Sequence, residues 1–257
     1  GNIAKLAAWL DCFQNSCYIA KTFNYCRPQL IENEQSFVNA CDIRHPLIEH
    51  IQTNETYVAN DISLGVENDG CLLYGTNAVG KSSLIKSIGI AIVMSQAGFY
   101  VPCSKFVLAP YQKIYTRILG NDNLFKGLST FAVEMSELRT ILESADQKSL
   151  VIGDELCSGT ESNSAISIFT AGVEWLHNKK SSFIFATHFH EIVNYDEIVN
   201  LERVKMMHLA VTYNPGLDCL IYDRKLRPGP GKDMYGLEVC KSLNLSSEFL
   251  SRAHSLR

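Results

Sequence analysis

One stretch of eight residues has the composition of a loop that binds phosphate. It runs from Gly75 to Ser82, reads GTNAVGKS, and fits the spacing GxxxxGK followed by Ser or Thr. In such a loop, successive backbone N–H groups and the positive end of the following helix point at one spot, which favours a polyphosphate. The pattern predicts that Lys81 reaches the β- and γ-phosphates and that the Ser82 hydroxyl binds Mg²⁺. A tight turn that needs its glycines only for backbone geometry is the alternative, and it leaves the Lys-Ser pair unexplained.

Two carboxylates follow an apolar run farther along the chain. The run 149–153 leads directly into Asp154 and Glu155. Such a run is common where a strand simply ends in solvent. Because it lies downstream of the phosphate loop, with a helix-length segment between, we interpret it as functional. It predicts that Asp154 lies beside the Mg²⁺ and that Glu155 is the base for the attacking water.

A histidine follows a third apolar run, 182–186. If parallel strands end at the same edge of a sheet, His188 lies near Gly80 and Asp154, where it could sense the γ-phosphate. A metal site at His188 and His190 would need more ligands than the neighbouring sequence supplies. His190 is therefore expected to be an ordinary surface or helix-start histidine.

The elements that must position these groups follow from the spacing of apolar residues. Apolar runs of strand length alternate with segments that repeat apolar residues every three or four positions, the helical period. This alternation predicts an α/β fold with a mixed or parallel central sheet flanked by helices. Strands are expected at 57–64, 71–74, 113–118, 149–154 and 182–186, helices at 83–97, 131–144 and 162–177, and a β-hairpin at 204–213 and 217–226.

Both ends of the chain have helical patterns. The first twenty residues repeat apolar side chains at three- and four-residue steps and predict an amphipathic helix that ends before Pro28. Two short helical patterns, 237–243 and 246–256, suit a helical hairpin that packs on a partner. The chain opens on Gly1 instead of Met, so we expect it to be a piece of a longer protein.

Bulk composition is that of an ordinary soluble globular protein, with 257 residues, 46% hydrophobic and 19% charged. A net charge of −4 gives no overall electrostatic footprint for nucleic acid, so any DNA contact would be local, indirect or made by other parts. No apolar run is long enough to span a bilayer, and no membrane partner is expected. Nine cysteines form no CxxC pair. Thiols used as small apolar residues in a reducing, intracellular compartment are the expectation.

Several segments together resemble one family. In the family's order, they are similar to motifs of the ATPase domain of MutS, the DNA mismatch repair proteins. The similar segments are Gly75–Ser83, Gly98–Pro102, Gly127–Met135, Asp154–Thr160 and Ala186–Phe189.

The resemblance extends along the whole chain and implies three domains. Residues 1–40 resemble the end of the helical lever that leads into the ATPase domain. Residues 41–234 resemble the ABC-type, P-loop ATPase domain itself. Tyr235–Val239 looks like the start of the C-terminal helix-turn-helix, which implies that residues 235–257 form a dimerisation segment.

MutS proteins are similar to ABC-type ATPases that work as dimers with two composite nucleotide sites. The resemblance therefore implies ATP and Mg²⁺ as cofactors and a second MutS-like subunit, in a homo- or heterodimer, as partner. By position, the resemblance implies that Tyr57 stacks on adenine and that the nucleotide is bound by Gly75, Asn77, Gly80, Lys81 and Ser83. It implies that Ser82 and Asp154 hold Mg²⁺ and that Glu155 is the base. It also implies that His188 is the γ-phosphate sensor and that Ser129 completes the partner's site.

Two motifs depart from the family's usual form. The usual GPNMGGKST is GTNAVGKSS at residues 75–83, and the usual DEIGRGT is DELCSGT at residues 154–160. Neither change removes a group that would bind phosphate or Mg²⁺ or act as the base. They indicate a divergent branch, similar to viral or organellar MutS homologues.

The expected function is ATP hydrolysis that drives the movement of a DNA clamp in mismatch repair, with DNA held mainly by domains outside this chain. The same motor in recombination control or ribosome rescue is the alternative. A nucleotide-gated dimerisation module with vestigial hydrolysis is a third hypothesis, and the intact Lys81, Ser82, Asp154 and Glu155 argue against it. A transporter subunit is disfavoured because Gly127–Thr130 is shorter than the transporters' glycine signature.

Overall fold

The structure is a computed structural model of the chain. Of the predicted site residues, Asn77 and Ser129 lie outside the part that it describes, as does most of the segment 235–239. The described residues are 1–51, 56–76, 79–117, 130–157, 159–214, 219–231, 237, 240–241 and 245–256.

Helices and strands alternate along the chain, which confirms the predicted α/β class. The helices are α1 (Asn2–Thr22), α2 (Ile48–Ile51), α3 (Lys81–Gln96), α4 (Thr130–Ser144), α5 (Ser162–Asn178), the 3-10 helix η2 (His190–Asn194), α6 (Asp196–Val199) and α8 (Ser247–Leu256). The strands are β1 (Gln29–Leu30), β2 (Phe37–Ile43), β3 (Asn60–Leu64), β4 (Gly70–Tyr74), β5 (Lys105–Ala109), β6 (Lys113–Arg117), β7 (Ser149–Asp154), β8 (Ser182–Ala186), β9 (Val204–Asn214) and β10 (Cys219–Pro228).

The larger sheet has six strands in the order β10-β9-β4-β8-β7-β6. Strands β9, β4, β8, β7 and β6 run parallel, and β10 pairs antiparallel with β9 at the edge. Every residue of β4, β7 and β8 is buried. Parallel strands covered on both faces give continuous apolar runs, and this is why their positions could be predicted.

A second sheet of four strands, in the order β1-β5-β2-β3, was not predicted. Strand β2 pairs antiparallel with both β3 and β5. In β2, the buried residues Val38, Ala40 and Ile43 alternate with more exposed ones, so its sequence reads as mixed and polar. The boundary placed after residue 40 falls inside this strand. The domain division stays a prediction, although residues 29–43 already contribute to the small sheet.

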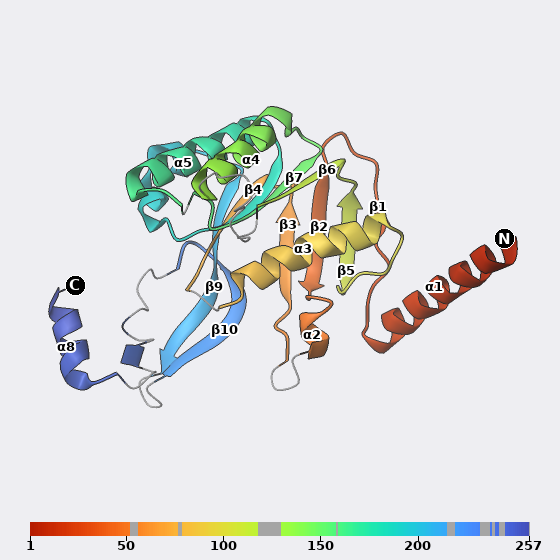
Figure 1. The fold of residues 1–257 in the computed structure, drawn as a ribbon, viewed down its shortest axis with the longest axis horizontal. Coiled ribbons are helices and arrows are strands. Elements are labelled where there is room, and N and C mark those ends of the chain that lie inside the picture. Colours follow the sequence, from red (N-terminus) through yellow and green to blue (C-terminus); the bar gives the residue numbers. More distant parts are fainter. Residues whose placement is uncertain are drawn as a thin grey trace.

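Helix α3 lies between the two sheets. One apolar cluster joins β2 and β3 of the small sheet, α3, and one face of the large sheet. A second cluster joins the opposite face of the large sheet to α4, α5 and α6. Figure 1 shows α4 and α5 on one face of the large sheet and α3 running past the other, beside the small sheet. The layers are therefore small sheet, α3, large sheet, and the α4–α5 pair.

Two aromatic residues of β8 fit against glycines on the strands at either side. Gly70 of β4 is the register partner of Phe183, and a Cβ at Gly70 would lie 2.1 Å from the Phe183 ring. Gly153 of β7 is the partner of Phe185, and a Cβ there would lie 2.7 Å from that ring. Interiors are close-packed, so larger residues at either glycine would displace a ring. These contacts favour one register on both sides of β8.

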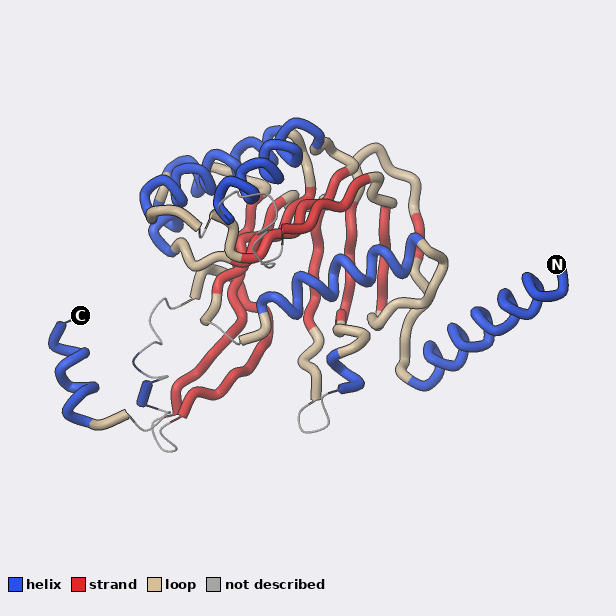
Figure 2. Tube along the Cα trace, in the orientation of Figure 1, coloured by secondary structure: helices blue, strands red, loops and turns tan. Residues whose placement is uncertain are grey.

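Helix α1 confirms the predicted N-terminal helix, but none of its residues is buried. Figures 1 and 2 show it extending away from the layers at one side, with α8 at the other side. Trp9 is 64% exposed, so the apolar face of α1 is not covered by the described part of this chain. Among the described helices, none has the length and apolar content needed to cross a bilayer.

Cysteine reactivity tests this arrangement. Cys12 and Cys17 lie exposed on α1, whereas Cys71 and Cys157 are buried. Burial raises the pKa of Cys71 and of Cys157 to about 12, so at pH 8 their reactive thiolate forms are on the order of 10⁻⁴ of the total. Iodoacetamide at pH 8 should therefore modify Cys12 and Cys17 first, as measured by mass spectrometry of the peptides. Denatured protein is the control, and equally fast labelling of Cys71 in the native protein would contradict the buried β4.

Candidate functional site

The predicted phosphate loop connects β4 to α3, as its motif requires. Gly75 has a φ of 146° and Gly80, which precedes α3, has a φ of 109°, a backbone region that favours glycine. Lys81 is the first residue of α3 and is only 5% exposed. Its Nζ donates hydrogen bonds to the carbonyl oxygens of Gly75, at 2.5 Å, and Thr76, at 3.2 Å. The loop thus folds back around the ammonium group.

The pKa of Lys81 is lowered from its ordinary value, and burial is the main cause. Burial lowers the pKa of its ammonium group, while the nearby carboxylates of Glu155 and Asp154 raise it. A buried ammonium group that keeps its charge is a strong binding group for an anion. The Thr76 hydroxyl is also buried, and it has no hydrogen-bond partner in the described part of the chain.

Ser82 and Asp154 meet at the edge of the large sheet. The Ser82 Oγ donates a hydrogen bond of 2.5 Å to Asp154 Oδ2. Asp154 is the last residue of β7, and Ser82 lies in the first turn of α3. A hydroxyl and a carboxylate oxygen side by side are hard ligands of the kind that Mg²⁺ prefers. The pair would supply two oxygen ligands to such an ion.

Within the described ranges, no group of three or more His, Cys, Asp or Glu side chains could hold a metal ion. The expectation that His188 and His190 hold no metal ion stays a prediction. His190 begins the 3-10 helix η2, and its ring centroid lies 4.8 Å from that of Tyr74. It is a helix-start residue, as expected.

Glu155 and His188 form a pair that the sequence did not predict. His188 Nε2 lies 2.6 Å from Glu155 Oε1, and their side chains are 43% and 27% exposed. Glu155 has a φ of 53°, and its N–H donates a hydrogen bond to Ala186 at the end of β8. The pair forms because β7 and β8 are adjacent and parallel, so the residues that follow them emerge together. Backbone in this left-handed region is costly for a glutamate and often marks a functional site.

The loop after Glu155 is held by a residue of α4. Glu134 is 5% exposed, and its Oε1 accepts a 2.7 Å hydrogen bond from the Cys157 N–H. Cys157 has a φ of 66°. A charged acceptor on a backbone donor makes a strong hydrogen bond, and here it stabilises a second left-handed residue. Sequence reasoning missed Glu134 because nothing in its local spacing indicates this contact.

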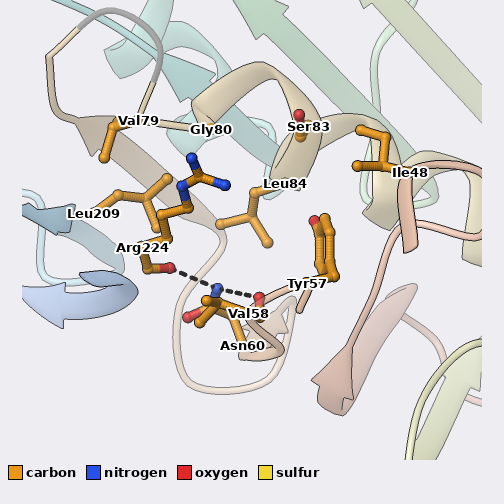
Figure 3. A pocket seen from close by; sticks show the side chains of 10 residues that line it. All are labelled: Ile48, Tyr57, Val58, Asn60, Val79, Gly80, Ser83, Leu84, Leu209 and Arg224. Atoms are coloured by element: carbon orange, nitrogen blue, oxygen red, sulfur yellow. Dashed lines mark hydrogen bonds between the residues drawn. The ribbon is translucent and has the colours of Figure 1, made fainter. Parts of the chain in front are cut away.

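A pocket lies beside the first turn of α3 (Figure 3). The Tyr57 ring and the Arg224 side chain lie on either side of Leu84 in this view. Burial raises the pKa of Tyr57, so its hydroxyl stays neutral at physiological pH. The pocket is lined by Ile48, Tyr57, Val58, Asn60, Val79, Gly80, Ser83, Leu84, Leu209 and Arg224.

The described members of the predicted site therefore lie together around the start of α3. Tyr57, Gly80 and Ser83 line the pocket, Gly75 contacts Lys81, Ser82 contacts Asp154, and Glu155 contacts His188. Their roles stay predictions. Sequence reasoning missed three further lining residues, Asn60 on β3, Leu209 on β9 and Arg224 on β10. No motif in the sequence links these strands to the glycine loop.

Comparison with known proteins places these residues in a family context. The sequence model of the family described as MutS domain V matches residues 71–257. A mutS homolog of Acanthamoeba polyphaga mimivirus is 37% identical, over 99% of this chain and 26% of its own length. The mitochondrial DNA mismatch repair protein mutS homolog of Sarcophyton glaucum is 39% identical, over 99% of this chain and 26% of its own.

A bacterial relative shows the same pattern. The DNA mismatch repair protein MutS of Staphylococcus haemolyticus is 36% identical, over 97% of this chain and 28% of its own length. The chain thus spans about a quarter of the length of these relatives.

Alanine substitutions at two glycines test the loop geometry. Among the described residues, none has an atom within 4 Å of a Cβ added at Gly80 or at Gly172. Gly80 has a positive φ, so Gly80→Ala should lower the free energy of unfolding by roughly 1–2 kcal/mol through backbone strain. Gly172 lies inside α5, so Gly172→Ala should raise it by roughly 0.5–1 kcal/mol. Urea unfolding measures both changes, and equal signs would contradict the left-handed geometry at Gly80.

Proposed function

We propose that this chain, which belongs to the MutS family of DNA mismatch repair proteins, binds ATP with Mg²⁺ and hydrolyses the ATP. The observation that carries the proposal is the convergence of three features at the start of α3. These are the glycine loop around Lys81, the Ser82–Asp154 pair, and the Glu155–His188 pair.

The loop would bind the triphosphate. Backbone N–H groups at the N-terminus of α3 and the helix dipole favour an anion there. The Lys81 ammonium would exchange its hydrogen bonds to the Gly75 and Thr76 carbonyls for bonds to phosphate oxygens. The buried Thr76 hydroxyl would gain an acceptor, which removes the cost of leaving it unpaired. Asn77, outside the described residues, remains a predicted phosphate contact.

Ser82 and Asp154 would hold Mg²⁺ between them and the phosphates. Bound there, the ion would neutralise charge on the β- and γ-phosphate oxygens. Asp154 is nearly buried, so its carboxylate is shielded from solvent and its interaction with a cation is strong.

Glu155 would act as the general base. It would take a proton from water as the water oxygen forms a bond to the γ-phosphorus and the bond to the ADP oxygen breaks, which releases phosphate. His188 contacts Glu155 directly, so it would orient the carboxylate. As the proposed γ-phosphate sensor, it would also link the base to the state of the nucleotide.

The pocket beside α3 would hold the base of the nucleotide. The Tyr57 ring offers an aromatic face for adenine, as predicted, and the Arg224 guanidinium offers a second planar group on the other side. Stacking of a base on such groups is worth about 1–3 kcal/mol and requires both planes to be held in place.

In the longer protein, ATP turnover would drive conformational change on DNA during mismatch repair. A second MutS-like subunit, in a homo- or heterodimer, would complete each nucleotide site through Ser129, a residue outside the described part of the chain. DNA would be held mainly by other domains, in keeping with the net charge of −4. Relatives named for mismatch repair favour this process over recombination control or ribosome rescue.

Glu155→Gln tests the base assignment. The amide keeps the shape of the carboxylate but cannot accept the proton, so ATP binding should persist while turnover falls roughly 100-fold or more. Binding of a fluorescent ATP analogue and release of phosphate measure the two effects. Glu191→Gln, at an exposed glutamate of η2, is the matched control and should leave both unchanged. A Glu155→Gln protein that hydrolyses ATP at the original rate would exclude Glu155 as the base.

Mixing two inactive variants tests whether the sites are shared. Lys81→Ala removes a group from the chain's own site, and Ser129→Ala removes one from its partner's site. A hybrid dimer of the two variants then contains one intact site, so hydrolysis should reappear on mixing. Each variant alone should stay inactive at the same total concentration. Absence of recovery in dimers shown by mass measurement to be hybrid would exclude the shared site.

A further inference from the structure

One buried amide connects the two sides of the pocket. Asn60, the first residue of β3, is 3% exposed and makes three hydrogen bonds to backbone groups. Its Nδ2 donates to the carbonyl oxygens of Val58, at 3.3 Å, and Arg224, at 3.1 Å. Its Oδ1 accepts a 2.7 Å bond from the Leu226 N–H. Figure 3 shows the amide between Val58 and Arg224, at the base of the pocket.

The partner segment of β10 is a bulge. Pairing between β9 and β10 shifts register between Tyr222 and Leu226, and within this interval Arg224 has a φ of 55°. Bulges leave backbone groups without ladder partners and redirect a side chain. Asn60 supplies both missing partners at this outer edge, one for the Arg224 carbonyl and one for the Leu226 N–H. The Lys225 ammonium adds a bond to the Ala59 carbonyl.

The same amide also fixes the opposite wall. Val58, whose carbonyl accepts from Asn60, directly follows Tyr57 in the chain. Tyr57 and Arg224 both line the pocket. Asn60 binds the carbonyl of Arg224 itself and the carbonyl of Val58, the neighbour of Tyr57. The Asn60 amide is a rigid planar group, and its bonds therefore fix the distance between the Tyr57 and Arg224 walls of the pocket.

We propose that Asn60 is a positioning residue that sets the spacing between Tyr57 and Arg224 for the planar base of a purine nucleotide. It acts through its bonds to Val58 and to the β10 bulge, from its place in the lining of the pocket. The inference rests on the proposed nucleotide binding and goes beyond it. Asn60 governs the part of the affinity that comes from the base and leaves the part that comes from the phosphates to the glycine loop.

Two ligands separate these parts of the affinity. Inorganic tripolyphosphate has the phosphates of ATP but no base. Asn60→Ala in the full-length protein should weaken ATP binding roughly 10-fold, within the range expected for lost base stacking. Tripolyphosphate binding and the maximal rate at saturating ATP should not change. Competition with a fluorescent nucleotide gives the dissociation constants of ATP and of tripolyphosphate. The ratio of these two constants is the readout.

Asn68→Ala is a matched control. Asn68 is also buried, lies near the other end of β3, and donates to the carbonyl oxygens of Ser63 and Gly70. It contacts no pocket residue in these bonds, so its loss should leave the ratio unchanged. An equal change of the ratio in both variants would mean that general disruption of β3 is the cause and would overturn the role of Asn60.

A double-mutant cycle tests the route through the bulge. If Asn60 acts by holding Arg224, then Asn60→Ala should have little further effect on the ratio in an Arg224→Ala protein. Fully additive effects would overturn that route. Asn60→Asp keeps the acceptor for Leu226 but loses both donors, so it should also weaken ATP binding selectively. It serves as the test if the alanine variant does not fold.

The outcomes distinguish the two proposals. Wild-type protein that binds neither ATP nor tripolyphosphate would overturn the proposed function. Wild-type protein that binds both, with a ratio that survives Asn60→Ala and Asn60→Asp unchanged, would overturn only the positioning role.

Discussion

The parallel alignment of β4, β8 and β7 is the constraint on which the site depends. Leu73 and Asp154 both pair with Ala186, so three strands reach the same edge at the same level. The glycine loop, the Asp154–Glu155 segment and His188 then emerge side by side. A slip of one residue would turn Asp154 to the opposite face of the sheet. Phe183 over Gly70 and Phe185 over Gly153 oppose such a slip on both sides of β8.

The packing that fixes this register is separate from the polar groups that would do the chemistry. The apolar clusters fill the layers on both faces of the large sheet, whereas the paired side chains lie at its edge and beside the start of α3. Strained backbone occurs at that edge, at Glu155 and Cys157, and the surrounding layers are what hold it. The stability of the fold thus supports local geometry that the loop could not keep alone.

Sequence reasoning worked where the signal was local. Buried parallel strands, the helices between them and the glycine loop are each encoded within a few consecutive residues. The edge residues Asp154 and His188 could be grouped because parallel strands share an edge. The small sheet was missed because only β3 lay within a predicted strand, and because exposed residues interrupt the buried ones of β2. Glu134 contacts Cys157, and Asn60 contacts Arg224. Each contact joins residues far apart in the chain, so no spacing rule could find it.

The bond between Glu134 and the Cys157 N–H gives α4 a mechanical role. Glu134 lies about one turn from the start of α4, and the loop that it holds begins at Glu155. If the helix moved without the loop, a buried carboxylate would lose its partner, which is costly. The bond therefore favours movement of helix and loop together. A displacement of the first turn of α4 would therefore act on the backbone of Cys157, two residues after Glu155.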